Sequence, residues 1–172
     1  DEAPSSIGIV FDASRSMEPK MAEARNAIER LFHYAIPGDE YQLVQFNDRP
    51  RLIRPLTTSA DDVRNGLFQV AAEGWTSLYD AVIYSAGLMR KASNSRRALF
   101  ILSDGMDNFS RYSEDELSSY MTEAGVVVYS IALNAGRFSP GQTRPLERLS
   151  EQTGGWCYRV PKIEKLTEAV EA

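Results

Sequence analysis

The stretch IGIVFDASRS, residues 7–16, decides the fold, because an apolar run ends abruptly in a polar loop. Ile7 to Phe11 is continuously apolar apart from Gly8. A strand that is buried on both faces has this pattern, and such strands occur in sheets that helices cover on both sides. Residues 18–36 then carry apolar side chains at three- and four-residue spacings, which predicts an amphipathic helix.

The rest of the chain repeats this alternation. Further strands are predicted at residues 41–46, 51–56, 98–102, 126–133 and 155–160. Further helices are predicted at residues 60–71, 77–91, 113–124 and 143–153, with a last helix from about residue 162. The short Asn47-Asp48 connection indicates an antiparallel hairpin, and Pro55 suits an edge strand. We therefore expect an α/β fold with a doubly wound, Rossmann-like, mostly parallel six-stranded sheet, one antiparallel edge strand and helices on both faces.

Size and composition favour one domain spanning residues 1–172. A net charge of -5 argues against nucleic acid or an anionic membrane as partner, since no positive field is available. No apolar stretch approaches the roughly 18 residues that direct membrane insertion needs. Cys157 is the single cysteine, which excludes an intrachain disulfide. The polar start without Met leads us to expect a piece of a longer protein.

Five oxygen donors follow the predicted strands or precede a predicted helix. In an extended loop Asp12, Ser14 and Ser16 would point to one side, and Asp104 ends another buried strand. Thr76 stands before the helix at 77, where Ser77 and Asp80 fit a capping box. In doubly wound sheets, ligands bind at the carboxyl ends of the strands. Hydroxyl and carboxylate oxygens suit Mg²⁺, Mn²⁺ or Ca²⁺ and not zinc, so the pattern predicts a metal site there.

Structural interpretations of the same residues stay open. Asp12 and Asp104 could be turn residues, and Ser14 and Ser16 could cap the following helix. A structural role is favoured for His33, and a solvated or supporting role for Asp107. The acids at residues 114–116 complement a helix dipole.

In this order, the motifs DASRS, GWTS and SDG resemble the metal-ion-dependent adhesion site of von Willebrand factor type A domains. The resemblance covers the whole chain, and the phrases TSLYDA and LSDGMDN look closest to the bacterial branch. It implies that Ser14, Ser16 and Thr76 coordinate the metal directly. It also implies that Asp12 and Asp104 hold the metal mostly through water.

The resemblance further implies a non-enzymatic adhesion module that grips an Asp or Glu carboxylate of a protein partner through the bound cation. It also favours a location outside the cytoplasm. Trp75 departs from the family, which commonly has a small residue there. Together with Met17, Met106 and Phe109 it predicts an apolar contact surface around the metal. Packing beneath the loops is the alternative.

Two other functions are weighed against adhesion. A magnesium-dependent phosphotransfer or receiver-like domain would also end its first strand in Asp12. Such domains need further acids beside that aspartate and a lysine after a later strand. Here Ala13 and Ser14 follow, and no lysine occurs between Lys91 and Lys162. A purely structural scaffold is the third alternative, and the complete donor set gives it no support.

Overall fold

A computed structural model describes residues 3–133 and 141–160. Its sheet has the strand order β3-β2-β1-β4-β5-β6. The strands are β1 (Ser5–Asp12), β2 (Glu40–Phe46), β3 (Pro50–Thr57), β4 (Arg96–Ser103), β5 (Val127–Leu133) and β6 (Cys157–Val160). Only the β2–β3 pair is antiparallel among these strands. The predicted six-stranded sheet with an antiparallel edge strand is therefore confirmed.

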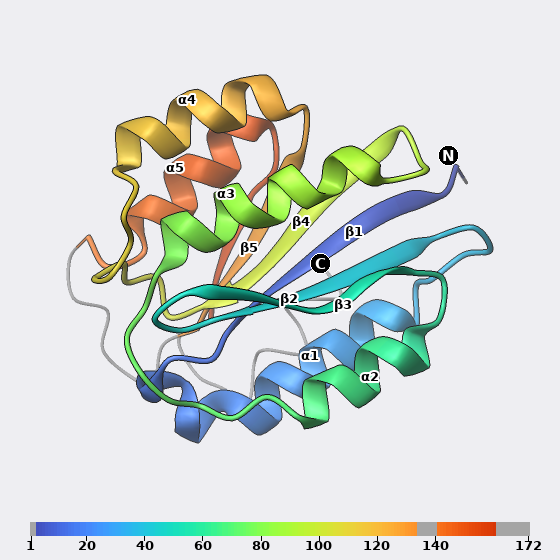
Figure 1. Ribbon diagram of the computed structural model, residues 1–172, viewed down its shortest axis with the longest axis horizontal. Helices are drawn as coiled ribbons and strands as arrows, with labels where there is room; N and C mark the ends of the chain where they lie inside the picture. The colour runs from blue at the N-terminus through green and yellow to red at the C-terminus, as the bar shows by residue number, and fades with distance from the viewer. Residues whose placement is uncertain (1–2, 134–140, 161–172) are drawn as a thin grey trace.

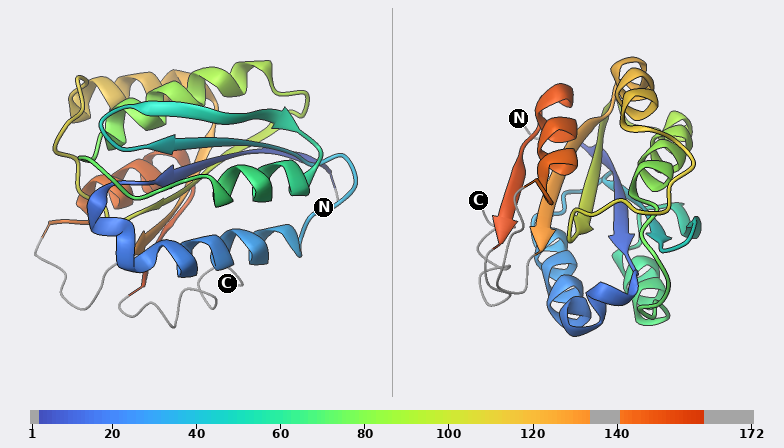
Figure 2. Two further views of the ribbon diagram at one scale, coloured as in Figure 1. Left: turned by 60° about the horizontal axis from the view of Figure 1, so that its bottom comes forward. Right: turned by 90° about the vertical axis from the view of Figure 1, so that its left-hand side faces the viewer.

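Helices cover both faces of the sheet (Figures 1 and 2). One face carries α1 (Met21–Phe32) and α2 (Ala60–Phe68), and the other carries α3 (Leu78–Leu88), α4 (Glu114–Ala124) and α5 (Arg144–Thr153). Along β1 the side chains alternate between these layers. Ile9 and Phe11 pack with α1 and α2, whereas Val10 packs with α3 to α5. All three are fully buried, which explains the unbroken apolar run.

The order of the strands in the sheet determines where the candidate site lies. From β1 the chain passes to β2 on one side and later to β4 on the other, so the strand order reverses at the β1–β4 pair. In that pair, Phe11 lies opposite Leu102. The carboxyl ends of β1 and β4, with Asp12 and Asp104, therefore lie side by side where ligands bind in doubly wound sheets.

Several predicted helix bounds differ from those observed. The helix expected at 18–36 begins instead as a 3-10 turn over Arg15–Lys20, and α1 follows from Met21. Pro19 lies inside that turn. The helix expected at 77–91 ends its α-helical part at Leu88 and continues as a 3-10 turn, Met89–Lys91. The helix predicted from about residue 162 lies outside the described residues. Within the described part, no helix combines the length and hydropathy that crossing a bilayer requires.

Candidate metal centre

The two aspartates lie at the ends of the central strands. Asp12 is the last residue of β1 and is fully buried, and Asp104 directly follows β4 and is also buried. One oxygen of Asp12 accepts a hydrogen bond from the Ser14 N–H (2.9 Å). The other accepts one from the Ser103 hydroxyl (2.6 Å). Ser103 thus orients Asp12 from the neighbouring strand. Sequence reasoning missed this role, although Ser103 stands beside Asp104 in the SDG motif.

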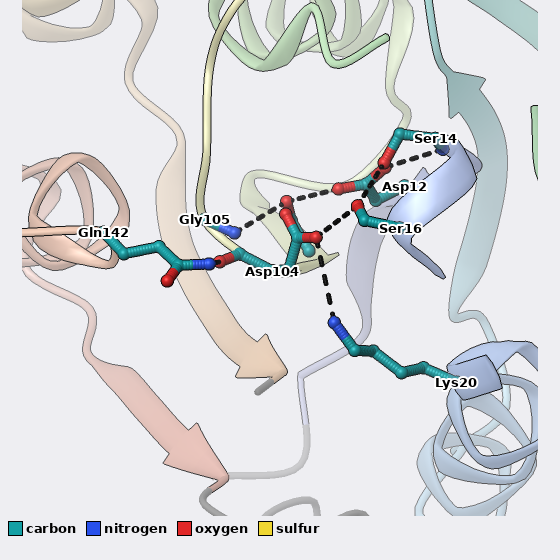
Figure 3. Close-up of polar contacts among 8 residues, drawn as sticks. Asp12, Ser14, Ser16, Lys20, Asp104, Gly105 and Gln142 are labelled. Atoms are coloured by element: carbon teal, nitrogen blue, oxygen red, sulfur yellow. Dashed lines mark hydrogen bonds and ion pairs between the residues drawn. The ribbon is translucent and has the colours of Figure 1, made fainter. Parts of the chain in front are cut away.

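The hydroxyls of the DASRS loop converge on Asp104 (Figure 3). Ser14 Oγ and Ser16 Oγ are 3.2 Å apart, and Ser16 donates a hydrogen bond to Asp104 Oδ2. Ser14 is the first residue before the 3-10 turn, yet its side chain makes no capping hydrogen bond. The capping alternative is therefore wrong for Ser14. The loop is also not fully extended, because Ser16 already belongs to the 3-10 turn that begins at Arg15.

Thr76 is held at the same edge by its backbone. Its N–H donates to Asn108 Oδ1 (2.9 Å), and its carbonyl accepts from the N–H groups of Asn108 (3.0 Å) and Phe109 (3.1 Å). Thr76 shares the lining of a cavity of about 450 Å³ with Ser14 and Ser16. The structure thus brings all five predicted donors to one end of the sheet.

The capping box expected at Ser77 and Asp80 is wrong. The Ser77 side chain makes no cap, and the Asp80 carboxylate accepts from the N–H groups of Arg111 (2.9 Å) and Tyr112 (3.1 Å). The loop after β4 caps α3 instead: Asp107 Oδ1 accepts from the Tyr79 N–H (3.2 Å). Asp107 therefore ties the loop carrying Asp104 to the helix that follows Thr76.

One carboxylate oxygen at the centre has no hydrogen-bond donor among the described residues. Asp104 Oδ1 is buried, and no described residue hydrogen-bonds to it. The Lys20 ammonium lies 3.8 Å from the other oxygen of Asp104, Oδ2 (Figure 3), and the Lys20 side chain is also buried. A buried acceptor without a donor costs about 1–3 kcal/mol, so Asp104 Oδ1 is suited to a cation or its water.

The donor chemistry fits a hard cation. Within residues 3–133 and 141–160, no three His, Cys, Asp or Glu side chains group as a conventional metal cluster. This centre instead brings together two carboxylates and the hydroxyls of Ser14 and Ser16, and Thr76 lines the adjoining cavity. Such all-oxygen sets suit Mg²⁺, which usually keeps several waters.

Burial changes the acidity of Asp12. Desolvation, followed by the nearby negative charge of Asp104, raises the pKa of Asp12 from 3.8 to about 6, although hydrogen bonds from Ser103 and Ser14 oppose the shift. A raised carboxyl pKa stabilises the fold at low pH. The contribution is complete below the unfolded value and is lost as pH rises through about 6.

We therefore expect metal-free protein to lose about 2 kcal/mol of stability between pH 4 and pH 7 relative to the Asp12→Asn variant, which cannot titrate at this position. Urea unfolding in the presence of a chelator at several pH values measures the difference. Parallel pH profiles for the two proteins would contradict it.

The predicted contact residues divide into two groups. Trp75, Met106 and Phe109 are 60%, 49% and 50% exposed, as a contact surface requires. Met17 is fully buried in the core on the α1 side, because the 3-10 turn directs it inward. Met17 is therefore removed from the contact surface. His33 is exposed at the end of α1.

Known proteins share this fold. A family model described as the von Willebrand factor type A domain matches residues 7–106. An aerotolerance-related membrane protein of Bacteroides fragilis NCTC 9343 has a similar solved structure, with 14% identity, TM-score 0.73, and 97% of this chain and 96% of that chain covered. A von Willebrand factor type A structure from Catenulispora acidiphila has 15% identity and TM-score 0.78, with 98% and 41% covered.

The PilB minor pilin from Streptococcus sanguinis is similar at 12% identity and TM-score 0.72, with 99% of this chain and 60% of that chain covered. The chain thus spans less than two thirds of the Catenulispora and Streptococcus proteins. At these identities the likeness establishes the fold. A search of curated proteins gave no match.

Proposed function

Because the chain belongs to the von Willebrand factor type A domain family, members of which commonly mediate protein–protein interaction, we propose that it is a divalent-metal-dependent protein-binding module. The observation that carries this proposal is the buried Asp104 Oδ1, which no described residue hydrogen-bonds, beside converging hydroxyls. The module is proposed to bind Mg²⁺, with Mn²⁺ or Ca²⁺ as alternatives.

The residues have distinct proposed roles. Ser14, Ser16 and Thr76 would hold the cation directly, and Asp12 and Asp104 would hold it mostly through water. Neutral hydroxyls leave the cation's charge largely uncompensated, so when bound it can accept a carboxylate oxygen from an Asp or Glu of a protein partner. Ser103 keeps Asp12 oriented, and Lys20 limits the negative charge that the two aspartates build up.

Trp75, Met106 and Phe109 are proposed to frame this centre and contact the partner. They are exposed apolar side chains on the loops that carry Thr76 and Asp104. The backbone of Trp75 is anchored, because its N–H donates to Asp48 Oδ1 (2.8 Å). A side chain on an anchored backbone loses less conformational freedom on binding.

A location outside the cytoplasm is proposed from the kinds of protein that share the fold. They include a minor pilin and an aerotolerance-related membrane protein.

The phosphotransfer alternative receives no structural support. Asp12 is fully buried, and both of its carboxylate oxygens accept hydrogen bonds. The lysine beside the centre, Lys20, comes from the 3-10 turn after β1 and contacts Asp104. We therefore propose a binding role and no catalytic one.

Calorimetric titration of metal-free protein with Mg²⁺ and Mn²⁺ tests the proposal. One saturable site is expected in the wild type. In Asp12→Ala and in the double variant Ser14→Ala/Ser16→Ala, the affinity for Mg²⁺ is expected to fall by about 100-fold or more. Each variant removes oxygen donors that water replaces poorly. Circular dichroism checks that the variants fold.

The titration is repeated with acetate present, since a carboxylate can complete the coordination. Absence of saturable binding in wild type under both conditions would refute the metal-dependent function.

A further inference from the structure

A cavity adjoins the proposed metal centre, with a volume of about 450 Å³. Its lining includes three of the proposed metal ligands, Ser14, Ser16 and Thr76. The rest of the lining includes Trp75 and Arg15. The cavity is thus continuous with the metal centre but larger than a cation and its waters need.

Arg15 is the charged side chain among the described residues that line this cavity. It is exposed, and no hydrogen bond or ion pair joins its guanidinium to the part of the chain that the structure describes. Guanidinium groups pair with carboxylates in a planar, two-pronged geometry. Arg15 is therefore available to an acidic group of a ligand.

The loops that carry Arg15 and Trp75 are joined to each other. The Arg15 N–H donates to the Gly74 carbonyl (3.1 Å), and the Glu73 N–H donates to the Ala13 carbonyl (2.8 Å). On the other side, the Ser77 N–H donates to the Asn47 carbonyl (2.9 Å). The cavity wall is thus preorganised by backbone bonds, which lowers the entropy cost of binding.

The charges indicate how many acidic groups the ligand carries. In the described metal centre, Lys20 already lies beside Asp104, whereas Arg15 is the charged side chain that lines the adjoining cavity. A bound cation and the Arg15 guanidinium are thus two separate positive groups that face the cavity. Two carboxylates on one ligand would each meet an opposite charge there.

From these observations we infer that the module recognises an acidic peptide segment with two nearby carboxylates. One carboxylate binds the metal, and the second pairs with Arg15 while the segment lies against the exposed Trp75 indole. This inference rests on the proposed metal-dependent function and adds a second acidic group to it.

The test uses capped peptides with two Asp residues separated by zero to three glycines. Matched peptides replace either Asp by Asn. Dissociation constants are measured by NMR titration in saturating Mg²⁺ and again in chelator. Trp156→Phe, which leaves Trp75 as the single tryptophan, allows Trp75 fluorescence to report contact at the cavity.

The best two-Asp peptide is expected to bind wild type about fivefold more tightly than its Asn counterparts, the effect of a partly exposed ion pair. It is also expected to change Trp75 emission. In Arg15→Gln this preference is expected to fall to the small statistical advantage of two equivalent carboxylates. Mg²⁺ affinity should not fall, because the variant removes a positive charge beside the cation. Lys91→Gln makes the same change in net charge at an exposed position beyond the far end of α3, and it should retain the preference.

Three results would overturn the inference. If wild type binds the one-Asp and two-Asp peptides equally in Mg²⁺, or if Arg15→Gln keeps the preference, the second-acid recognition is wrong and the metal-dependent function stands. If no peptide binds in a Mg²⁺-dependent way, the proposed function fails together with it.

Discussion

Asp104→Asn is expected to weaken Mg²⁺ binding by about 100-fold. Asparagine has nearly the shape of aspartate, so it can still accept the Ser16 hydrogen bond. It lacks the negative charge that the buried Oδ1, to which no described residue hydrogen-bonds, would direct toward a cation. Loss of an anionic group that holds a metal through water typically costs 10–100-fold in affinity.

Asp107→Asn is the matched control. It makes the same chemical change on the same loop, and its oxygen can still accept from the Tyr79 N–H. Calorimetry should show near wild-type Mg²⁺ affinity for this variant, and Mg²⁺ should raise its melting temperature as in wild type. Equal losses in the two variants would mean that general loop charge, and not Asp104, governs binding.

Asp104→Asn has a second expected consequence. Apart from burial, the charge of Asp104 is the cause that raises the pKa of Asp12, whereas the hydrogen bonds from Ser103 and Ser14 lower it. In metal-free protein the variant should therefore lower the pKa of Asp12 and flatten the fall in stability between pH 4 and pH 7. An unchanged pH profile would place the origin of the Asp12 shift in burial alone.

Gly155→Ala is expected to destabilise the domain by about 4 kcal/mol or more, a large part of the 5–15 kcal/mol of a typical domain. A Cβ at this position would lie 2.0 Å from the carbonyl oxygen of Val128, which is backbone of the neighbouring strand. Backbone hydrogen bonds fix the chain around Gly155. The Gly155 N–H donates to the Ser150 carbonyl (2.9 Å), and the carbonyl of the next residue, Trp156, accepts from the Ser130 N–H of β5 (3.0 Å). The clash cannot be relieved without separating β6 from β5.

Gly154→Ala is the matched control, because it replaces a glycine without creating this clash. Gly154 has φ +87° at the end of α5, and a Cβ there would have no atom within 4 Å. Only the left-handed backbone is then strained, at a cost of about 1–2 kcal/mol. Urea unfolding compares the two variants. A Gly155→Ala variant no less stable than Gly154→Ala would show that the two strands can move apart easily.

The sheet could be predicted from the sequence because a strand buried on both faces is marked by a run of neighbouring apolar residues. Strands enclosed by helices on both faces are continuously apolar, as Ile7 to Phe11 and residues 98–102 are. The short Asn47-Asp48 connection likewise limits the pairing to an antiparallel hairpin. Where a helix begins is less local: the 3-10 turn from Arg15 to Lys20 was not expected from the spacing of apolar residues.

The sequence by itself therefore determined the fold class, the edge of the sheet where the site lies, and the residues Asp12, Ser14, Ser16, Thr76 and Asp104 as candidate metal ligands. Each of these depends on residue type and position relative to a strand or helix end. Whether these residues bind a metal stays a prediction.

Only the tertiary structure decided which groups meet at that edge. Ser103 reaches Asp12 because β1 and β4 pair in one register, and Lys20 reaches Asp104 from the end of the 3-10 turn that follows β1. The cap of α3 comes from Asp107 on a distant loop, not from the residues next to the helix. Contacts between segments far apart in the chain depend on strand register and helix start, and neither leaves a pattern in the local sequence.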